Sequence, residues 1–132
     1  MRVKVNQQNN ITILTILDDM ILDTLAEFQQ TIDSLIADGH FSIMLDFYHL
    51  EFISSRGLGA IGKLVDVLRK KGGDLKIFGM KKEVKHLFDI CGLSRIIDVF
   101  QTQDDALLSW GDNVGAIEKR LLWSIKQSGS NS

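Results

Sequence analysis

The sequence predicts one α/β domain, in which helices cover mainly one face of a mixed β-sheet. Two patterns indicate this class: an initial pair of strands with alternating apolar residues, and then short apolar runs that alternate with stretches of helical periodicity. A length of 132 residues with 45% hydrophobic residues is enough for a single core. The expected order of elements is β-β-α-β-α-β-α-β-α, because strands joined through helices pack side by side in one sheet.

The N-terminal third predicts a hairpin, a helix and a buried strand. Residues 3–16 alternate apolar and polar side chains around the turn-forming sequence Gln8-Asn9-Asn10. Thr24 and Glu27 have the spacing of a capping box, so the first helix is expected to begin there and to end at Gly39. Residues 41–47 form a nearly continuous apolar run, which is typical of a central strand covered on both faces.

The middle of the chain predicts a second helix and a further strand. A loop over residues 48–54 leads to a helix that begins near Ser55 and ends at Gly72-Gly73. The next strand is expected at residues 75–78. The inner stripe of this helix is formed by Leu58, Ile61, Val65 and Leu68.

A third helix, a fifth strand and a fourth helix complete the expected domain. The apolar stripe of the third helix includes Cys91, which we therefore expect in the core. The fifth strand is expected at residues 96–100. Thr102 and Asp105 then have the Ser/Thr-x-x-acid form of a helix start, and this helix runs through Trp110.

The chain divides at Gly111 into a domain over residues 1–110 and a C-terminal extension over residues 111–132. The extension predicts a short helix packed on protein, followed by a polar tail. The apolar stripe of that helix consists of Val114, Ile117, Leu121 and Ile125.

Composition excludes several functional classes. A formal net charge of -2 gives no basic footprint for nucleic acid, and no apolar run is long enough to predict insertion into a membrane. The single cysteine cannot form an internal disulfide, which favours a reducing compartment and hence a cytoplasmic location. The His and Cys residues lack the spacing of a metal site, so no metal or cofactor is expected.

The glycine-rich segment after Ile53 matches or approaches two nucleotide-binding sequence patterns, but it lacks the context that each pattern needs. Gly57, Gly59 and Gly62 match a dinucleotide fingerprint, but an eight-residue loop separates them from the preceding strand. Gly57 and Gly62-Lys63 also approach a P-loop, but Leu64 stands where that loop needs a hydroxyl. Neither pattern is supported.

A hydrolase is likewise not predicted. Ser55 with His49 or His86 and Asp46 supplies the residue types of a catalytic triad, but no Gly-x-Ser-x-Gly elbow surrounds Ser55. We therefore expect no catalytic residue and no enzyme. A serine at the start of a helix is first of all a cap. A phosphate attached there would meet the positive end of the helix, and Gly57 would leave room for a partner.

Residues 50–60 resemble the signature of the STAS domain, in particular that of bacterial anti-sigma-factor antagonists. The resemblance extends through residues 72–77, 84–93 and 105–107 and covers about residues 3–110. It implies the STAS-type α/β sandwich with the order of elements given above. It also implies a binding switch: the unphosphorylated antagonist binds an anti-sigma factor that is a GHKL-type serine kinase, and so releases a sigma factor.

Matched by position, the resemblance implies phosphorylation of Ser55 by that kinase and its reversal by a PP2C-type phosphatase. Ser54 stands where members of the family commonly have Asp, and Ile21 stands where they have an acidic residue. The alternative is a constitutive STAS adaptor, such as a subunit of an ABC-type transporter ATPase, and self-association as a homodimer is a further expectation. The partner surface is expected to comprise Asp18, Asp19, Met20, Ser54, Arg56, Gly57, Gly59 and Lys63.

Overall fold

The computed structural model describes residues 2–110, so the helix expected at residues 114–126 lies outside the described residues. The described elements are β1 (Val3–Gln8), β2 (Ile11–Ile16), α1 (Leu22–Ala37), β3 (Ser42–Asp46), α2 (Ser55–Lys70), β4 (Asp74–Phe78), α3 (Lys82–Ile90), the 3₁₀ helix η1 (Leu93–Arg95), β5 (Asp98–Phe100) and α4 (Gln103–Leu108). The predicted order and the predicted α/β class are confirmed.

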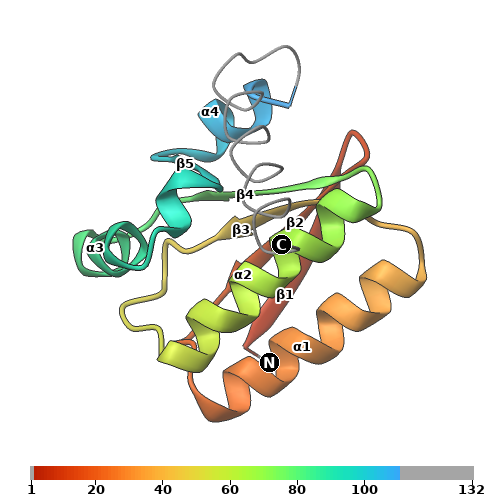
Figure 1. Cartoon of the computed structure of the whole chain (residues 1–132). Helices are drawn as coiled ribbons and strands as arrows, with labels where there is room; N and C mark the ends of the chain where they lie inside the picture. The colour runs from red at the N-terminus through yellow and green to blue at the C-terminus, as the bar shows by residue number, and fades with distance from the viewer. Residues whose placement is uncertain (1, 111–132) are drawn as a thin grey trace, which may run out of the picture.

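The five strands form one mixed sheet in the order β1-β2-β3-β4-β5. β1 and β2 are antiparallel, and the other neighbours are parallel. Asn9 and Asn10, with φ of 51° and 69°, make the hairpin turn, since Asn tolerates the left-handed conformation that such a turn needs. Helices α1 and α2 lie side by side over one face of the sheet (Figure 1). Because three strands run parallel after β2, the loops at their carboxyl ends meet at one edge.

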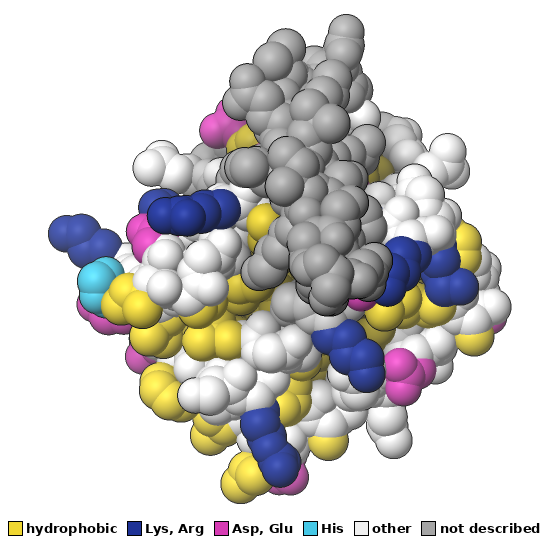
Figure 2. Space-filling view, in the orientation of Figure 1, with side chains coloured by type: hydrophobic (Ala, Val, Ile, Leu, Met, Phe, Trp, Pro, Cys, Tyr) yellow, Lys and Arg dark blue, Asp and Glu magenta, His cyan; other side chains and the backbone are white. Residues whose placement is uncertain are grey.

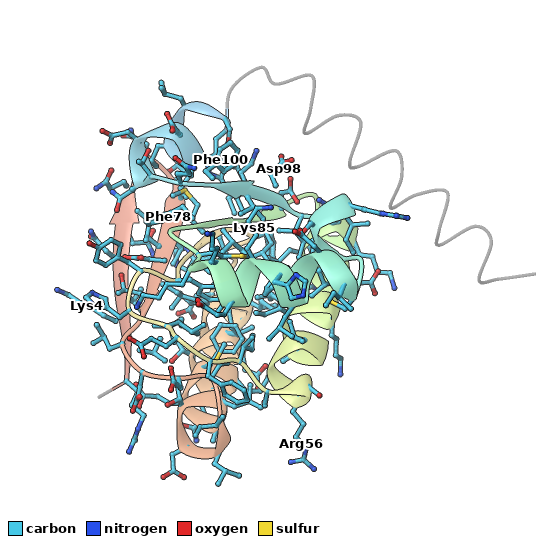
Figure 3. All side chains as sticks on the ribbon, turned by 90° about the vertical axis from the view of Figure 1, so that its left-hand side faces the viewer. Lys4, Arg56, Phe78, Lys85, Asp98 and Phe100 are labelled. Atoms are coloured by element: carbon cyan, nitrogen blue, oxygen red, sulfur yellow. The ribbon has the colours of Figure 1, made fainter. Side chains whose placement is uncertain are left out.

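The core has two parts because both faces of the sheet are covered. Ile43 and Leu45 face α1 and α2, whereas Met44, between them in β3, faces the smaller cluster around α4, and all three are fully buried. The expectation of a strand covered on both faces is confirmed. In Figure 3, Phe78 and Phe100 lie close to α4, on this second face.

A buried ion pair between β4 and β5 also contacts the end of α4. The Nζ of Lys76 lies 3.3 Å from Asp98 Oδ2 and donates to the carbonyl of Ser109 at 3.2 Å. It also lies 5.1 Å from the centre of the Trp110 ring. Lys76 is 1% exposed, so its charge is compensated by these contacts rather than by water.

The start of α1 differs from the prediction. Its N-cap is Ile21, with no side-chain cap, and Thr24 is buried. The carboxylate of Glu27 instead accepts hydrogen bonds from the backbone N–H groups of Arg2, at 3.0 Å, and of Val3, at 2.8 Å. These two backbone donors hold the pKa of Glu27 below its ordinary value. The predicted capping box is therefore wrong, because a contact with β1 takes the acidic partner.

Two further expectations are corrected near the C-terminal end of the domain. Cys91 is exposed and forms the C-cap of α3, because the helix ends at Ile90 and its last turn leaves the core. The fifth strand begins at Asp98 rather than at residue 96, since the chain first makes the 3₁₀ turn Leu93–Arg95.

Candidate functional site

Two adjacent serines begin α2, and they have different environments. Ser54 is the N-cap: its Oγ accepts a hydrogen bond from the N–H of Gly57 at 3.1 Å and donates one to the carbonyl of Met20 at 3.1 Å. Ser55 is the first residue of the helix and is exposed. The expected start of this helix near Ser55 is confirmed, and the capping residue is Ser54. The hydroxyl of Ser54 is occupied in both directions, whereas Ser55 faces solvent.

The loop before α1 and the loop before α2 are joined by backbone hydrogen bonds. The N–H of Met20 donates to the carbonyl of Phe52 at 2.9 Å, and the N–H of Ser54 donates to the carbonyl of Met20 at 3.2 Å. Asp19 adds a clamp, because its Oδ1 accepts from the N–H groups of Glu51 and Phe52, both at 3.0 Å. Asp19 thus fixes the position of the loop that presents Ser55.

Two residues predicted for partner contact serve the interior instead. Met20 is 0% exposed and packs below the loop, so the expectation that it contacts a partner is wrong. Gly57 is also buried. A Cβ at Gly57 would lie 2.7 Å from Cγ1 of Ile53 and 3.0 Å from Cγ of Met20, so internal packing requires glycine there.

The other predicted residues lie at the surface. Asp18, Arg56, Gly59 and Lys63 are exposed, and a Cβ at Gly59 would meet nothing within 4 Å. Figure 3 shows Arg56 projecting beyond the N-terminal end of α2. Asp18 forms an exposed ion pair with Arg2, with Oδ2 3.8 Å from Nε. Their role in binding a partner stays a prediction.

Beside Ser55, α1 and α2 line a cavity of about 1040 Å³ that is open to solvent. Leu22, at its edge, is 80% exposed, and Ile21 is 44% exposed. Figure 2 shows apolar side chains over this part of the face. The α1 side of the cavity was not predicted from the sequence, where the adjacent apolar residues Ile21 and Leu22 do not by themselves indicate a cavity. The cavity is lined by Ile21, Leu22, Asp23, Leu25, Ala26, Gln29, Ser54, Ser55, Arg56, Gly59, Ala60 and Lys63.

The structure also bears on the other functional classes. Gly57, Gly59 and Gly62 lie within α2 rather than in a loop, so neither nucleotide-binding pattern has the geometry it needs. Over residues 2–110, no three His, Cys, Asp or Glu side chains come together in a way that could hold a metal ion. None of the described helices combines the length and apolar character needed to cross a membrane.

Comparison with known proteins gives one family. The model of the STAS domain family matches residues 2–106. The anti-sigma F factor antagonist of Paenibacillus polymyxa is 31% identical over 65 residues, which are 49% of this chain and 56% of that protein. The anti-sigma-B factor antagonist of Bacillus subtilis is 36% identical over 50 residues, which are 38% of this chain and 46% of that protein. The matches thus span about half the length of these curated relatives.

A solved structure shows the same fold. The crystal structure of an anti-sigma factor antagonist from Mycobacterium paratuberculosis superposes with a TM-score of 0.75 at 21% identity. The superposition covers 83% of this chain and 93% of that one.

Proposed function

The chain belongs to the STAS domain family, and from this premise we propose that it is an anti-sigma-factor antagonist switched by phosphorylation of Ser55. In its unphosphorylated form it binds an anti-sigma factor that is also a GHKL-type serine kinase, and a sigma factor is released. The kinase phosphorylates Ser55, and a PP2C-type phosphatase removes the phosphate. The chain itself is a binding protein and a kinase substrate, not an enzyme. Its expected location is the cytoplasm, together with these partners.

The exposed hydroxyl of Ser55 at the edge of an apolar cavity is the observation that carries the proposal. Ser54 is less suited as an acceptor, because its Oγ already makes two hydrogen bonds and is partly buried. A kinase that reaches Ser55 also lies against Ile21, Leu22 and Gly59, which line the same cavity. Substrate recognition and the switch thus share one surface.

A phosphate on Ser55 would act on the partner more than on the fold. The first turn of a helix has backbone N–H groups without intrahelical partners and a positive dipole end, so it accepts an anion. The added charge is about -1.5 to -2 at neutral pH. In a closed interface that charge has to leave water, which weakens binding wherever the partner offers no cation there.

The proposal is tested with the full chain, the cognate kinase and ATP, read by intact mass. We expect one added phosphate on the native chain and on Ser54→Ala, and none on Ser55→Ala. Labelling of Ser55→Ala, with the phosphate mapped to Ser54, contradicts the assignment. Absence of both labelling and binding would contradict the antagonist function and favour the constitutive adaptor.

A second test concerns the surface. Gly59→Arg places a long side chain in the cavity, and the open space around Gly59 lets the fold accept it. We expect affinity for the anti-sigma factor to fall by at least about tenfold, while the midpoint of thermal unfolding stays within a few degrees. A folded Gly59→Arg protein with unchanged affinity would place the interface elsewhere.

A further inference from the structure

The cavity beside Ser55 is one end of a longer groove between α1 and α2. A second cavity, of about 370 Å³, lies between the same two helices and shares Gln29, Ala60 and Lys63 with the first. Together they extend from Ile21 and Ser54 at one end to Ala37 and Val67 at the other. A helix of 16 residues, the length of α1, is about 24 Å long. The groove is therefore long enough for a helix of about that length.

Apolar side chains line the groove along its length, between charged residues on its two walls. Leu25 and Ile36 contribute from α1, and Leu64 and Val67 from α2. At Ala60 the side chain is short, so the groove is open where the two cavities meet. An apolar channel of this shape fits a row of side chains at helical spacing better than a compact small molecule.

The two walls of the groove carry opposite charge. From Leu22 to Ala37, α1 contains no Lys or Arg, and its Asp23 and Asp33 line the groove. On the α2 wall the charged side chains are Arg56 and Lys63. The α1 wall is thus negatively charged and the α2 wall positively charged, so a bound partner can be oriented by complementary charges.

We propose that this groove binds an amphipathic helix of another protein, with the apolar stripe of that helix facing inward. Basic side chains on one flank of the helix face α1, and acidic side chains on the other flank face α2. Turning the helix end for end would exchange its flanks, so the charged walls also fix its direction. The inference rests on the proposed function only for the identity of the partner, the anti-sigma factor. The groove itself extends well beyond Ser55.

The experiment uses the full chain, labelled with ¹⁵N, and a designed 16-residue peptide. The peptide has Leu at helical spacing on one face, Lys on one flank, Glu on the other, and a nitroxide at its N-terminus. We expect amide shifts at Gln29, Ala60 and Val67 and paramagnetic broadening at one end of the groove only. A second peptide with Lys and Glu exchanged should broaden the opposite end.

A matched pair of variants tests the charge of the α1 wall. Asp33→Lys reverses a charge that lines the groove, whereas Asp38→Lys reverses an exposed charge just after α1 that does not line it. We expect Asp33→Lys to weaken binding of the peptide by about three- to tenfold. Asp38→Lys should change it by less than about twofold.

Several results would overturn the inference. One is that the peptide causes no amide shifts in the groove. A second is that both peptides broaden the same end of the groove. A third is that Asp33→Lys and Asp38→Lys change the affinity for the peptide equally. Without peptide, a shift of the groove amides in Leu121→Asp would assign the groove to the chain's own C-terminal segment. A shift on dilution would assign it to a second copy. If the peptide binds as expected but no anti-sigma factor binds the chain, the proposed function fails and the groove stands.

Discussion

At the scale of single residues, Ser54 and Ser55 show that the same type of side chain can have different roles at adjacent positions. The hydroxyl of Ser54 is held by two hydrogen bonds, which join the start of α2 to the loop before α1. A carboxylate at position 54 could accept from the N–H of Gly57 but could not donate to the carbonyl of Met20. The serine therefore adds a hydrogen bond that an ionised Asp cannot make.

We predict that Ser54→Ala lowers the free energy of unfolding by about 1–2 kcal/mol, because a helix cap and a hydrogen bond to a loop carbonyl are both lost. The matched control, Ser55→Ala, should change it by less than about 0.5 kcal/mol, since that hydroxyl is exposed. Urea unfolding of the three proteins measures both values. Equal losses in the two variants would contradict the assignment of the cap.

Two glycines of α2 make a second residue-scale prediction. Gly57→Ala should destabilise the protein by about 1–3 kcal/mol, because the new methyl group would overlap the side chains of Ile53 and Met20. Gly59→Ala should be neutral or stabilising by up to about 1 kcal/mol, because the site is open and Ala favours a helix. Thermal unfolding of the two variants distinguishes them. A loss at Gly59 as large as that at Gly57 would refute the packing argument.

At the scale of elements, tertiary contacts explain why the capping box predicted for α1 does not form. Thr24 and Glu27 form a sound capping pattern in the sequence, but Thr24 is buried and Glu27 binds the backbone of β1. The pairing of Glu27 with Val3 joins residues 24 positions apart, which no local pattern reports. It also occupies an N–H donor on a strand at the edge of the sheet, where unpaired groups invite association.

The contact of Glu27 predicts a dependence of stability on pH. Its pKa is lowered in the folded protein by the N–H groups of Arg2 and Val3, so the charged form stabilises the fold above the unfolded-state pKa. That contribution is lost as the pH falls from the unfolded-state pKa through the lower folded-state pKa. The stability difference between the native chain and Glu27→Gln should thus be largest at neutral pH and shrink in this window.

Thermal midpoints measured across the acid range check this prediction. Glu83→Gln, which removes an exposed carboxylate in the first turn of α3, is the control for loss of charge alone. A constant difference between Glu27→Gln and the native chain, from neutral pH to well below the ordinary pKa of a glutamate, would show that the carboxylate does not act through its ionised form.

The order of elements was predictable, whereas the groove was not. The apolar run at residues 41–47 and the stripe of α2 each lie in one segment, so periodicity indicates both. The groove requires Leu25 of α1 and Ala60 of α2 to line the same cavity, and only the packing of the two helices on the sheet places them there. Cys91 shows a limit of periodicity: the apolar stripe of α3 was predicted correctly at Val84 and Phe88, but Cys91, one turn later, lies after the end of the helix.

At the scale of the whole molecule, the proposed switch is local. The chain has a formal net charge of -2, so a phosphate roughly doubles the net charge. At physiological ionic strength, however, fields from exposed charges fade over about 8 Å. The phosphate is thus felt by whatever lies against Ser55 and hardly by the rest of the protein. The fold and its thermal midpoint should therefore be nearly the same in both forms.

The dissociation constant of the full chain for its cognate anti-sigma factor, measured by calorimetry with Ser55 free and then stoichiometrically phosphorylated, tests the central claim most directly. We predict that phosphorylation weakens binding by about 10²-fold or more, because a desolvated charge costs several kcal/mol in the interface. Ser55→Asp should weaken it in the same direction, and Ser55→Ala should bind like the native chain. Equal affinity of the phosphorylated and unphosphorylated forms would contradict the account.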